Sequence, residues 1–202
     1  MKSKGLIIAL AIVGGIILLG IMTITWGIGT YNGLVAMDES VNGAWSQVQN
    51  QYQRRFDLIP NLVETVKGYA THEKETLENV ANARAKVGQM VISPEVLKNP
   101  QSFQMFEKAQ GELTSALTRL MAVSENYPNL KANENFLQLQ AQLEGTENRI
   151  SVERKRFNEV VQVYNTRIKT IPTSLIAGFG GFAARPYFQA QAGAESAPKV
   201  KF

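Results

Sequence analysis

The pattern of apolar residues begins with a long uncharged segment. Residues 5–37 contain no Asp, Glu, Lys or Arg, and their apolar centre runs over residues 6–26. A helix rises about 1.5 Å per residue, so roughly 20 apolar residues cross the hydrocarbon of a bilayer. A secretory signal peptide is the competing interpretation, but its apolar region has about 7 to 15 residues and precedes an Ala-x-Ala-like cleavage site. Because the run is too long and no such site follows it, we predict a transmembrane anchor over residues 1–30.

Beyond the anchor, apolar residues recur every three or four positions, as on the core-facing side of a helix. This stripe stays in phase across Pro60, which cannot donate a backbone hydrogen bond and clashes with the preceding helical turn. Phase alone favours a kinked helix, whereas a turn over residues 58–61 gives two helices of similar length, which suits an up-and-down bundle. We predict the turn. The stripe consists of Leu34, Val41, Trp45, Val48, Tyr52, Ile59, Leu62, Val66, Tyr69, Leu77 and Val80.

Capping signals divide the rest of the chain into further helices. The segment after the turn ends near Gly88, a residue type common just beyond helix C-termini. The pairs Ser93-Pro94 and Asn99-Pro100 each place a capping side chain before a proline at the first helical position. A third helix is expected over residues 101–126, where Tyr127-Pro128-Asn129 interrupts the pattern.

The last helix, expected over residues 130–171, has the most regular heptad repeat of the chain. Such repeats are typical of helices that pack side by side in bundles. The sequence therefore predicts an all-α fold, with an N-terminal transmembrane helix and an up-and-down four-helix bundle of long amphipathic helices over residues 31–171. The repeat consists of Phe136, Leu143, Ile150, Phe157, Tyr164 and Ile171.

Polar side chains interrupt the apolar seams of these helices. Arg55, Glu147 and Arg154 stand at seam positions, where a buried ion costs several kcal/mol, by order of magnitude, unless it is paired. They either extend to the edge of the bundle or form a network between helices that joins Arg54 or Arg55 to Glu144 or Glu147. We leave both interpretations open, and in the second the network specifies helix register.

The composition changes at Pro172 to glycine, alanine and scattered aromatic residues, so residues 172–202 are expected to form an irregular tail. The tail has too many large apolar groups for a purely solvated segment. It either folds back on the bundle or membrane surface, or docks on another protein as a linear motif. The candidate partner-binding residues are Phe182, Tyr187, Phe188, Lys199 and Phe202.

Charge narrows the choice of partners. The net charge is +4, but residues 31–171 are balanced, and the excess lies at the two ends of the chain. Nucleic acid is therefore not an expected partner, because its binding needs a basic patch on the folded domain. Lys2 and Lys4 before the anchor favour a cytoplasmic N-terminus and an extracytoplasmic bundle in the inner membrane. The chain has no cysteine, which excludes disulfides and thiolate zinc sites.

No residue pattern indicates catalysis, a cofactor or a metal site. The single histidine is His72, and the zinc-protease pattern His-Glu-x-x-His fails at Thr76. Gly178-x-Gly180-x-x-Ala183 imitates a dinucleotide fingerprint but lacks the strand and helix that make such a loop bind pyrophosphate. We predict that the chain is not an enzyme.

Small residues four positions apart occur in the anchor, at Ala11 and Gly15 and at Gly29 and Gly33. This spacing lets helices approach closely in lipid, so a homo-oligomer is a possible assembly.

The chain resembles the bacterial LemA family over nearly its whole length. Residues 44–69 (AWSQVQNQYQRRFDLIPNLVETVKGY) carry the most specific part of the likeness, with further matches over residues 139–150 (LQAQLEGTENRI) and 197–202 (APKVKF). The departures are small: Phe56, Phe157 and Gln189 stand where the family pattern has Ala, Tyr and Glu.

The resemblance implies a membrane anchor followed by a four-helix bundle, in a family of envelope-associated accessory proteins without an established enzymatic activity. Together with the residue patterns it favours a membrane-tethered helical interaction protein whose partners are the lipid bilayer and an unidentified membrane or envelope protein. Its contacts would be made by the bundle surface and the tail. Two alternatives are a self-assembling scaffold that organises or shapes membrane and a bundle that binds a ligand at its polar seam.

Overall fold

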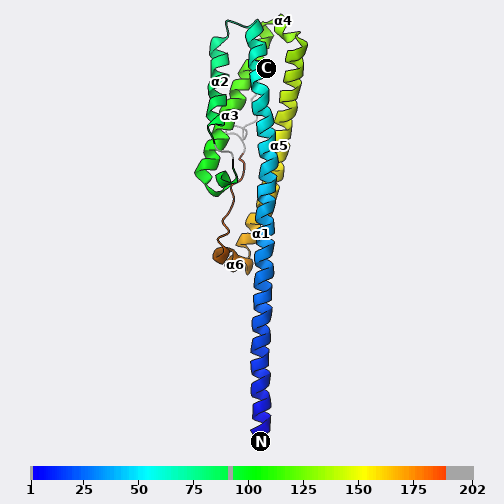
Figure 1. The fold of residues 1–202 in the computed structure, drawn as a ribbon, viewed down its shortest axis with the longest axis vertical. Helices are drawn as coiled ribbons and strands as arrows, with labels where there is room; N and C mark the ends of the chain where they lie inside the picture. Colours follow the sequence, from blue (N-terminus) through cyan, green and yellow to red (C-terminus); the bar gives the residue numbers. More distant parts are fainter. Residues whose placement is uncertain (1, 91–92, 190–202) are drawn as a thin grey trace, which may run out of the picture. The chain divides into compact units, whose positions relative to one another are not determined.

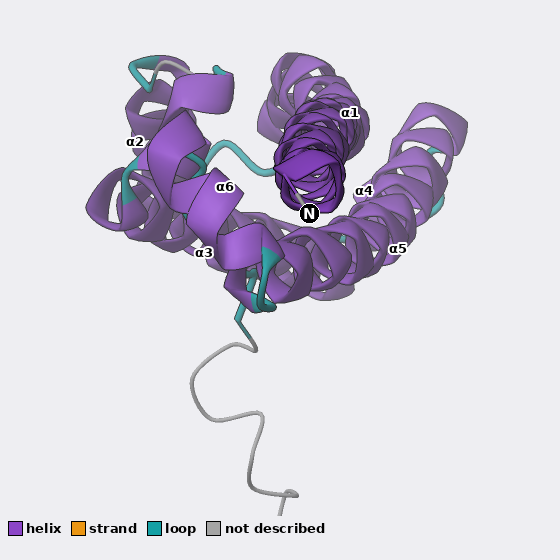
Figure 2. Cartoon of the chain, turned by 90° about the horizontal axis from the view of Figure 1, so that it is seen from below, coloured by secondary structure: helices purple, strands orange, loops and turns teal. Residues whose placement is uncertain are grey.

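The computed structural model describes residues 2–90 and 93–189, and every regular element within these ranges is a helix (Figure 2). The predicted all-α fold is confirmed. Two compact units are present. Described residues up to Val41 and those from Gln162 to Ala184 form the first, and residues Asn42 to Val161 with those from Arg185 onward form the second.

Five helices of eight or more residues run through the described chain: α1 (Lys2–Tyr69), α2 (Lys74–Gly88), α3 (Pro100–Val123), α5 (Glu134–Lys169) and α6 (Thr173–Gly180). Shorter helices connect them: η1 (Pro94–Lys98), η2 (Ser124–Asn126) and α4 (Pro128–Lys131). In the second unit, α2, α3 and the adjoining parts of α1 and α5 lie side by side as a four-helix bundle (Figure 1).

The predicted turn over residues 58–61 is wrong. α1 continues as one helix through Pro60 and ends at Tyr69, and residues 70–73 make the turn into α2. The seam explains why the helix continues, because Ile59 and Leu62 are both buried on the same side of α1. Pro60 itself is exposed, so its ring and its missing N–H face away from the core.

Two asparagine caps set helix starts in the second unit. The Asn99 side chain accepts hydrogen bonds from the backbone N–H groups of Gln101, at 2.9 Å, and Ser102, at 3.3 Å, where the sequence predicts a helix start. The Asn133 side chain likewise accepts from the backbone N–H of Phe136 at 3.0 Å and precedes α5. The expected last helix over residues 130–171 is thus divided into α4 and α5.

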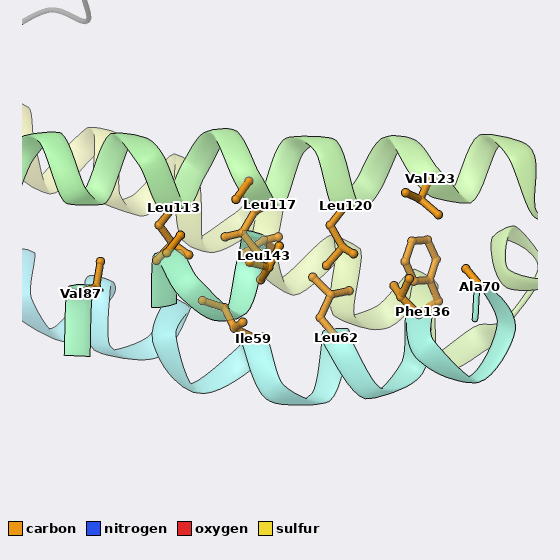
Figure 3. Close-up of a cluster of buried hydrophobic side chains, with 14 of the residues drawn as sticks. Ile59, Leu62, Ala70, Val87, Leu113, Leu117, Leu120, Val123, Phe136 and Leu143 are labelled. Atoms are coloured by element: carbon orange, nitrogen blue, oxygen red, sulfur yellow. The ribbon is translucent and has the colours of Figure 1, made fainter. Parts of the chain in front are cut away.

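A continuous apolar core fills the second unit. Leu113, Leu117 and Leu120 on α3 point toward Ile59 and Leu62 on α1 (Figure 3). Val87 from α2 and Phe136 and Leu143 from α5 complete this layer (Figure 3). All of these side chains are buried, so each helix of the bundle contributes the apolar face that its repeat predicts.

The N-terminal part of α1 is apolar on all sides. Every large apolar side chain described from Ile7 to Ile28 is between 43% and 68% exposed. Among the described helices, α1 alone is long and apolar enough to cross a membrane, with a mean hydropathy of 2.1 over its most apolar window. The hydroxyls of Thr23 and Thr25 donate to the carbonyls of Leu19 and Ile21 within the helix, so neither needs water as an acceptor. These are the properties of a single-pass membrane protein.

The start of the tail differs from the expected irregular structure. Residues Thr173–Gly180 form the two-turn helix α6, which ends at Gly181 with φ of +72°. The backbone N–H of Phe182 donates to the carbonyl of Ala177 at 3.0 Å, which is the long hydrogen bond of a glycine-terminated helix. Glycine at 181 is therefore required by the helix end, and it stops α6 rather than preventing it. Residues 182–189 follow without regular structure.

Candidate interaction site

An aromatic pocket lies in the second unit, where three bundle helices meet. Its walls are Trp45 from α1, Phe103 and Phe106 from α3, and Phe157 from α5, all at most 2% exposed. The Trp45 ring centroid lies 5.4 Å from that of Phe106, 5.7 Å from Phe157 and 5.9 Å from Phe103. Each of these positions belongs to an apolar seam, so the helical repeat brings the four rings together.

A residue from the C-terminal segment fills this pocket. Phe188 is only 6% exposed, and its ring centroid lies 5.0 Å from Phe103, 5.4 Å from Phe157 and 6.0 Å from Trp45. The guanidinium carbon of Arg154 lies 4.5 Å from the Phe188 centroid, over the face of the ring. The bundle thus holds an aromatic side chain that lies 30 residues beyond Asn158 in the sequence.

The bundle also binds the backbone of the same segment. Asn158 donates to the Phe188 carbonyl and accepts from the Phe188 N–H, both at 2.9 Å. At the next residue, Arg154 donates to the Gln189 carbonyl at 3.0 Å and Glu107 accepts from the Gln189 N–H at 3.2 Å. Arg154 and Glu107 pair with each other at 3.3 Å. Side chains of the bundle therefore bind the backbone N–H and carbonyl of both Phe188 and Gln189. The aromatic pocket in addition holds the side chain of Phe188.

Burial raises the pKa of the Glu107 carboxyl above its ordinary value, against the opposing effects of the Gln189 N–H and the Arg154 charge. The side chain of Glu107 is 20% exposed, so water compensates the charge only in part. The charged carboxylate is therefore retained for the hydrogen bond and ion pair that it makes, although burial opposes its ionisation.

This raised pKa predicts a pH dependence of stability. A group whose pKa is higher in the folded state stabilises the fold when it is protonated. This stabilisation is fully present below the unfolded-state pKa and is lost as the pH rises through the folded-state pKa. We therefore expect lowering the pH from about 7 to about 4 to stabilise the wild type relative to Glu107→Gln. The difference between their free energies of unfolding should change by about 1 kcal/mol or less. Urea unfolding of both proteins at the two pH values measures the difference. A gap that is constant, or that moves the other way, contradicts the prediction.

A second polar arrangement lies deeper in the bundle. Arg55 is 1% exposed, and its Nη1 donates to Glu147 at 2.7 Å and to the Thr114 hydroxyl at 2.8 Å. Its Nη2 donates to the Gln110 side-chain oxygen. Arg55 Nε and Gln110 Nε2 are buried with no hydrogen-bond partner among the described residues. One charge thus links α1, α3 and α5, but its polar network is incomplete.

The structure separates the predicted seam residues. Arg55 lies against Glu147, and Arg154 lies against Glu107, whereas Arg54 is exposed and outside both pairs. Glu144 is exposed and accepts from Gln140 on its own helix at 2.9 Å. Of the pairs named from the sequence, only Arg55 with Glu147 is formed among the described residues, and Arg154 pairs instead with Glu107, which was not named.

Four partners of these arginines and of the tail were not identified from the sequence: Glu107, Gln110, Thr114 and Asn158. All but Asn158 come from α3, whose predicted inward-facing residues are all apolar. Gln110 is 5% exposed on the buried side of α3, and a polar residue at such a seam position was the signal that could have found it.

The candidate tail residues have different environments. Phe188 is buried in the pocket, whereas the adjacent Tyr187 is 41% exposed. Phe182 belongs to the first unit and packs edge-on against Tyr31, with ring centroids 5.5 Å apart. Lys199 and Phe202 lie outside the described residues. The tail thus folds back on its own chain at Phe182 and Phe188, and Tyr187 remains accessible.

The remaining polar groups of the described residues lie apart from the aromatic pocket. Within residues 2–90 and 93–189, no group of three or more His, Asp or Glu side chains is placed to hold a metal ion. His72 is exposed in the turn between α1 and α2. An open hollow of about 920 Å³ lies along α2 and α3, where Lys86 pairs with Glu112 at 2.9 Å. The Lys86 hydrogen bond lowers the pKa of Glu112, which is typical of a solvated surface pair.

The fold and the pocket define a membrane-anchored, all-α bundle protein that holds part of its own C-terminal segment. The chain belongs to the LemA family, whose family model matches residues 44–202. This confirms the family that the sequence resembles.

The chain is similar to magnetosome and LemA proteins of bacteria. Magnetosome protein MamQ of Paramagnetospirillum magneticum is 27% identical over 175 residues, which cover 79% of this chain and 64% of the relative. Magnetosome protein MamQ of Magnetospirillum gryphiswaldense is 26% identical over 174 residues, covering 78% of this chain and 64% of the relative. Protein LemA of Metamycoplasma hominis is 25% identical over 153 residues, covering 74% of this chain and 64% of the relative. The match thus spans just under two thirds of the length of each relative.

Proposed function

We propose that the protein is a membrane-tethered helical interaction protein of the bacterial cell envelope that performs no catalysis. Its N-terminal helix confines the bundle to the membrane surface, which raises the effective concentration of the bundle for membrane-bound partners. The bundle surface and the C-terminal segment make the contacts. Membership of the LemA family and the apolar N-terminal half of α1 support the tether.

The seated C-terminal segment carries the proposal. Asn158, Glu107 and Arg154 bind backbone groups that every amino acid has, while the aromatic pocket selects one large side chain. Extended peptides are commonly recognised in this way, with backbone hydrogen bonds giving affinity and a pocket giving specificity. The same side chains can therefore hold an extended aromatic segment of another protein when Phe188 leaves, and the released tail can contact a partner.

A matched pair of asparagine variants tests this proposal. Asn158→Ala removes the double hydrogen bond to Phe188, whereas Asn148→Ala changes an exposed residue on the same helix. Both full-length proteins are crosslinked in native membranes, and the captured proteins are identified. We expect Asn158→Ala to change the set of partners several-fold in yield and Asn148→Ala to leave it as in the wild type. Identical partner sets for all three proteins would remove the pocket and the tail from the proposal.

The side of the membrane is part of the same proposal. The two lysines before the anchor support a cytoplasmic N-terminus and an extracytoplasmic bundle in the inner membrane. Because the chain has no cysteine, Glu64→Cys provides a unique label site on the exposed face of the bundle. Its reaction with an impermeant maleimide in intact cells supports this orientation, and reaction only after lysis contradicts it.

A further inference from the structure

α6 has an apolar stripe that nothing in the described chain covers. Leu175 is 62% exposed and Phe179 94%, and the two residues are four positions apart in α6, so they lie along one side of the helix. Ile171, in the turn before α6, is 81% exposed as well. The opposite side is fixed, because Thr173 and Ala177 are each 2% exposed. One side of α6 therefore packs against the protein, and the exposed side also carries large apolar residues.

The surroundings of this stripe are apolar as well. No charged residue occurs between Lys169 and Arg185, which is the longest uncharged stretch of the chain after residues 5–37. A surface helix of a soluble domain usually has charged or polar residues on the side that faces water. A water-exposed location does not explain this composition.

α6 packs directly on the end of the apolar half of α1, within the same unit (Figure 1). Ile176, Phe179 and Gly180 border a small apolar hollow with Gly27, Ile28 and Tyr31 of α1. Ile176 Cδ1 lies 3.8 Å from the position of a Cβ at Gly27, and the ring of Phe182 lies against Tyr31. At Gly180 a Cβ would lie 2.7 Å from Phe182 and 3.1 Å from Tyr31, so this approach requires glycine.

That part of α1 has the residue types expected at the boundary of the lipid. Trp26 and Tyr31 end the apolar run, and both aromatic residue types are enriched where a transmembrane helix leaves the hydrocarbon. The exposed side chains of Ile24 and Ile28 belong to the same uninterrupted apolar surface that must be covered by lipid. The stripe on α6 is apolar like that surface and lies beside its C-terminal end.

We propose that α6 is an interfacial helix that inserts Leu175 and Phe179 into the boundary between headgroups and acyl chains, beside the point where α1 leaves the membrane. Helices of this kind lie in the plane of the interface with their apolar side about 5 to 10 Å deep. The polypeptide then contacts the bilayer twice, once through the span of α1 and once through α6. This inference rests on the proposed membrane span.

Single-cysteine spin labels test the proposal, because the chain has no native cysteine. Labels at Leu175→Cys and Phe179→Cys are measured in the full-length protein in phosphatidylcholine vesicles, for collision with oxygen and with a water-soluble nickel chelate. Ile17→Cys gives the reference for the lipid interior, and Glu64→Cys gives the reference for water. We expect the oxygen-to-chelate ratio at both α6 sites to be several-fold above that at Glu64→Cys and below that at Ile17→Cys.

The references keep the two ideas separate. Ratios at positions 175 and 179 equal to that at Glu64→Cys, with Ile17→Cys still in lipid, would overturn the interfacial helix and leave the membrane span in place. A water-like ratio at Ile17→Cys would overturn the span, and the interfacial helix with it. Retained helical content in each variant confirms that the labelled protein is folded.

Discussion

Replacing Glu147 with Leu is expected to lower the free energy of unfolding by about 3 kcal/mol, because it removes the acidic partner of a buried charge. Arg55 is 1% exposed and cannot reach water, so its charge stays buried when Glu147 is lost. Gln110 and Thr114 still accept hydrogen bonds from it but carry no negative charge. For a chain of this length the loss corresponds to a fall in Tm of roughly 6 to 12 °C.

The neighbouring acid provides the control. Glu144→Leu changes an exposed residue on the same helix, which accepts a hydrogen bond from Gln140 one turn away. Its effect is expected to stay within about 0.5 kcal/mol. Both variants are compared with the wild type by thermal unfolding of the full-length protein in detergent, followed by far-UV circular dichroism. Equal Tm values for the two variants would mean that Arg55 reaches solvent and that the buried network does not hold the helices together.

A double variant distinguishes loss of the Arg55–Glu147 ion pair from the cost of leaving one charge unpaired. If the loss in Glu147→Leu comes from an unpaired charge, then Arg55→Met combined with Glu147→Leu restores much of it, because a buried ion pair is often replaceable by apolar residues. The unpartnered Arg55 Nε and Gln110 Nε2 strengthen this expectation, since the native network already leaves buried polar atoms unsatisfied. A double variant less stable than either single variant would instead show that the site cannot be packed with apolar side chains.

Most of the bundle could be predicted from the sequence because its cause is local. The heptad positions Phe136, Leu143, Ile150 and Phe157 are all buried, and Asn99 caps the helix that begins at Pro100. Spacing and capping act over a few residues, so they are visible in one sequence. At Pro60 the proline favoured a turn and the phase of the apolar seam favoured a continuous helix. The helix continues, because the seam residues before and after Pro60 are both buried.

The contacts of the site could not be predicted in the same way because they join distant residues. Arg55 and Glu147 are 92 positions apart, and Gln189 and Glu107 are 82 apart. A seam pattern shows which residues face inward but not which of them meet at the same height. Arg54 and Arg55 were therefore equally plausible partners of an acid, and only the rotation of α1 distinguishes them. Ile171 shows the converse, since it continues the heptad in sequence but lies beyond the end of α5 and is 81% exposed.

Replacing Phe188 with Ala is expected to release the C-terminal segment from the bundle. The side chain is 6% exposed and contacts Trp45, Phe103, Phe157 and Arg154, so its loss leaves a cavity in the pocket and removes the main apolar contact of the segment. Truncation of a buried Phe costs about 3 to 5 kcal/mol, and release of the segment limits the loss to about 3 kcal/mol by letting water reach the pocket. The neighbouring Tyr187→Ala, at a residue 41% exposed, is expected to lose less than about 1 kcal/mol.

Trp45 reports this release directly. It stacks on Phe188 with an interplanar angle of 25°, and a Trp26→Phe background leaves it as the only tryptophan of the chain. Acrylamide quenching of Trp45 should rise several-fold in Phe188→Ala and stay unchanged in Tyr187→Ala, because only the first substitution uncovers the indole. Asn158→Ala should give an intermediate value, since it removes the backbone hydrogen bonds but keeps the ring. Unchanged quenching in Phe188→Ala would show that the pocket closes without Phe188, so that the segment does not control access to it.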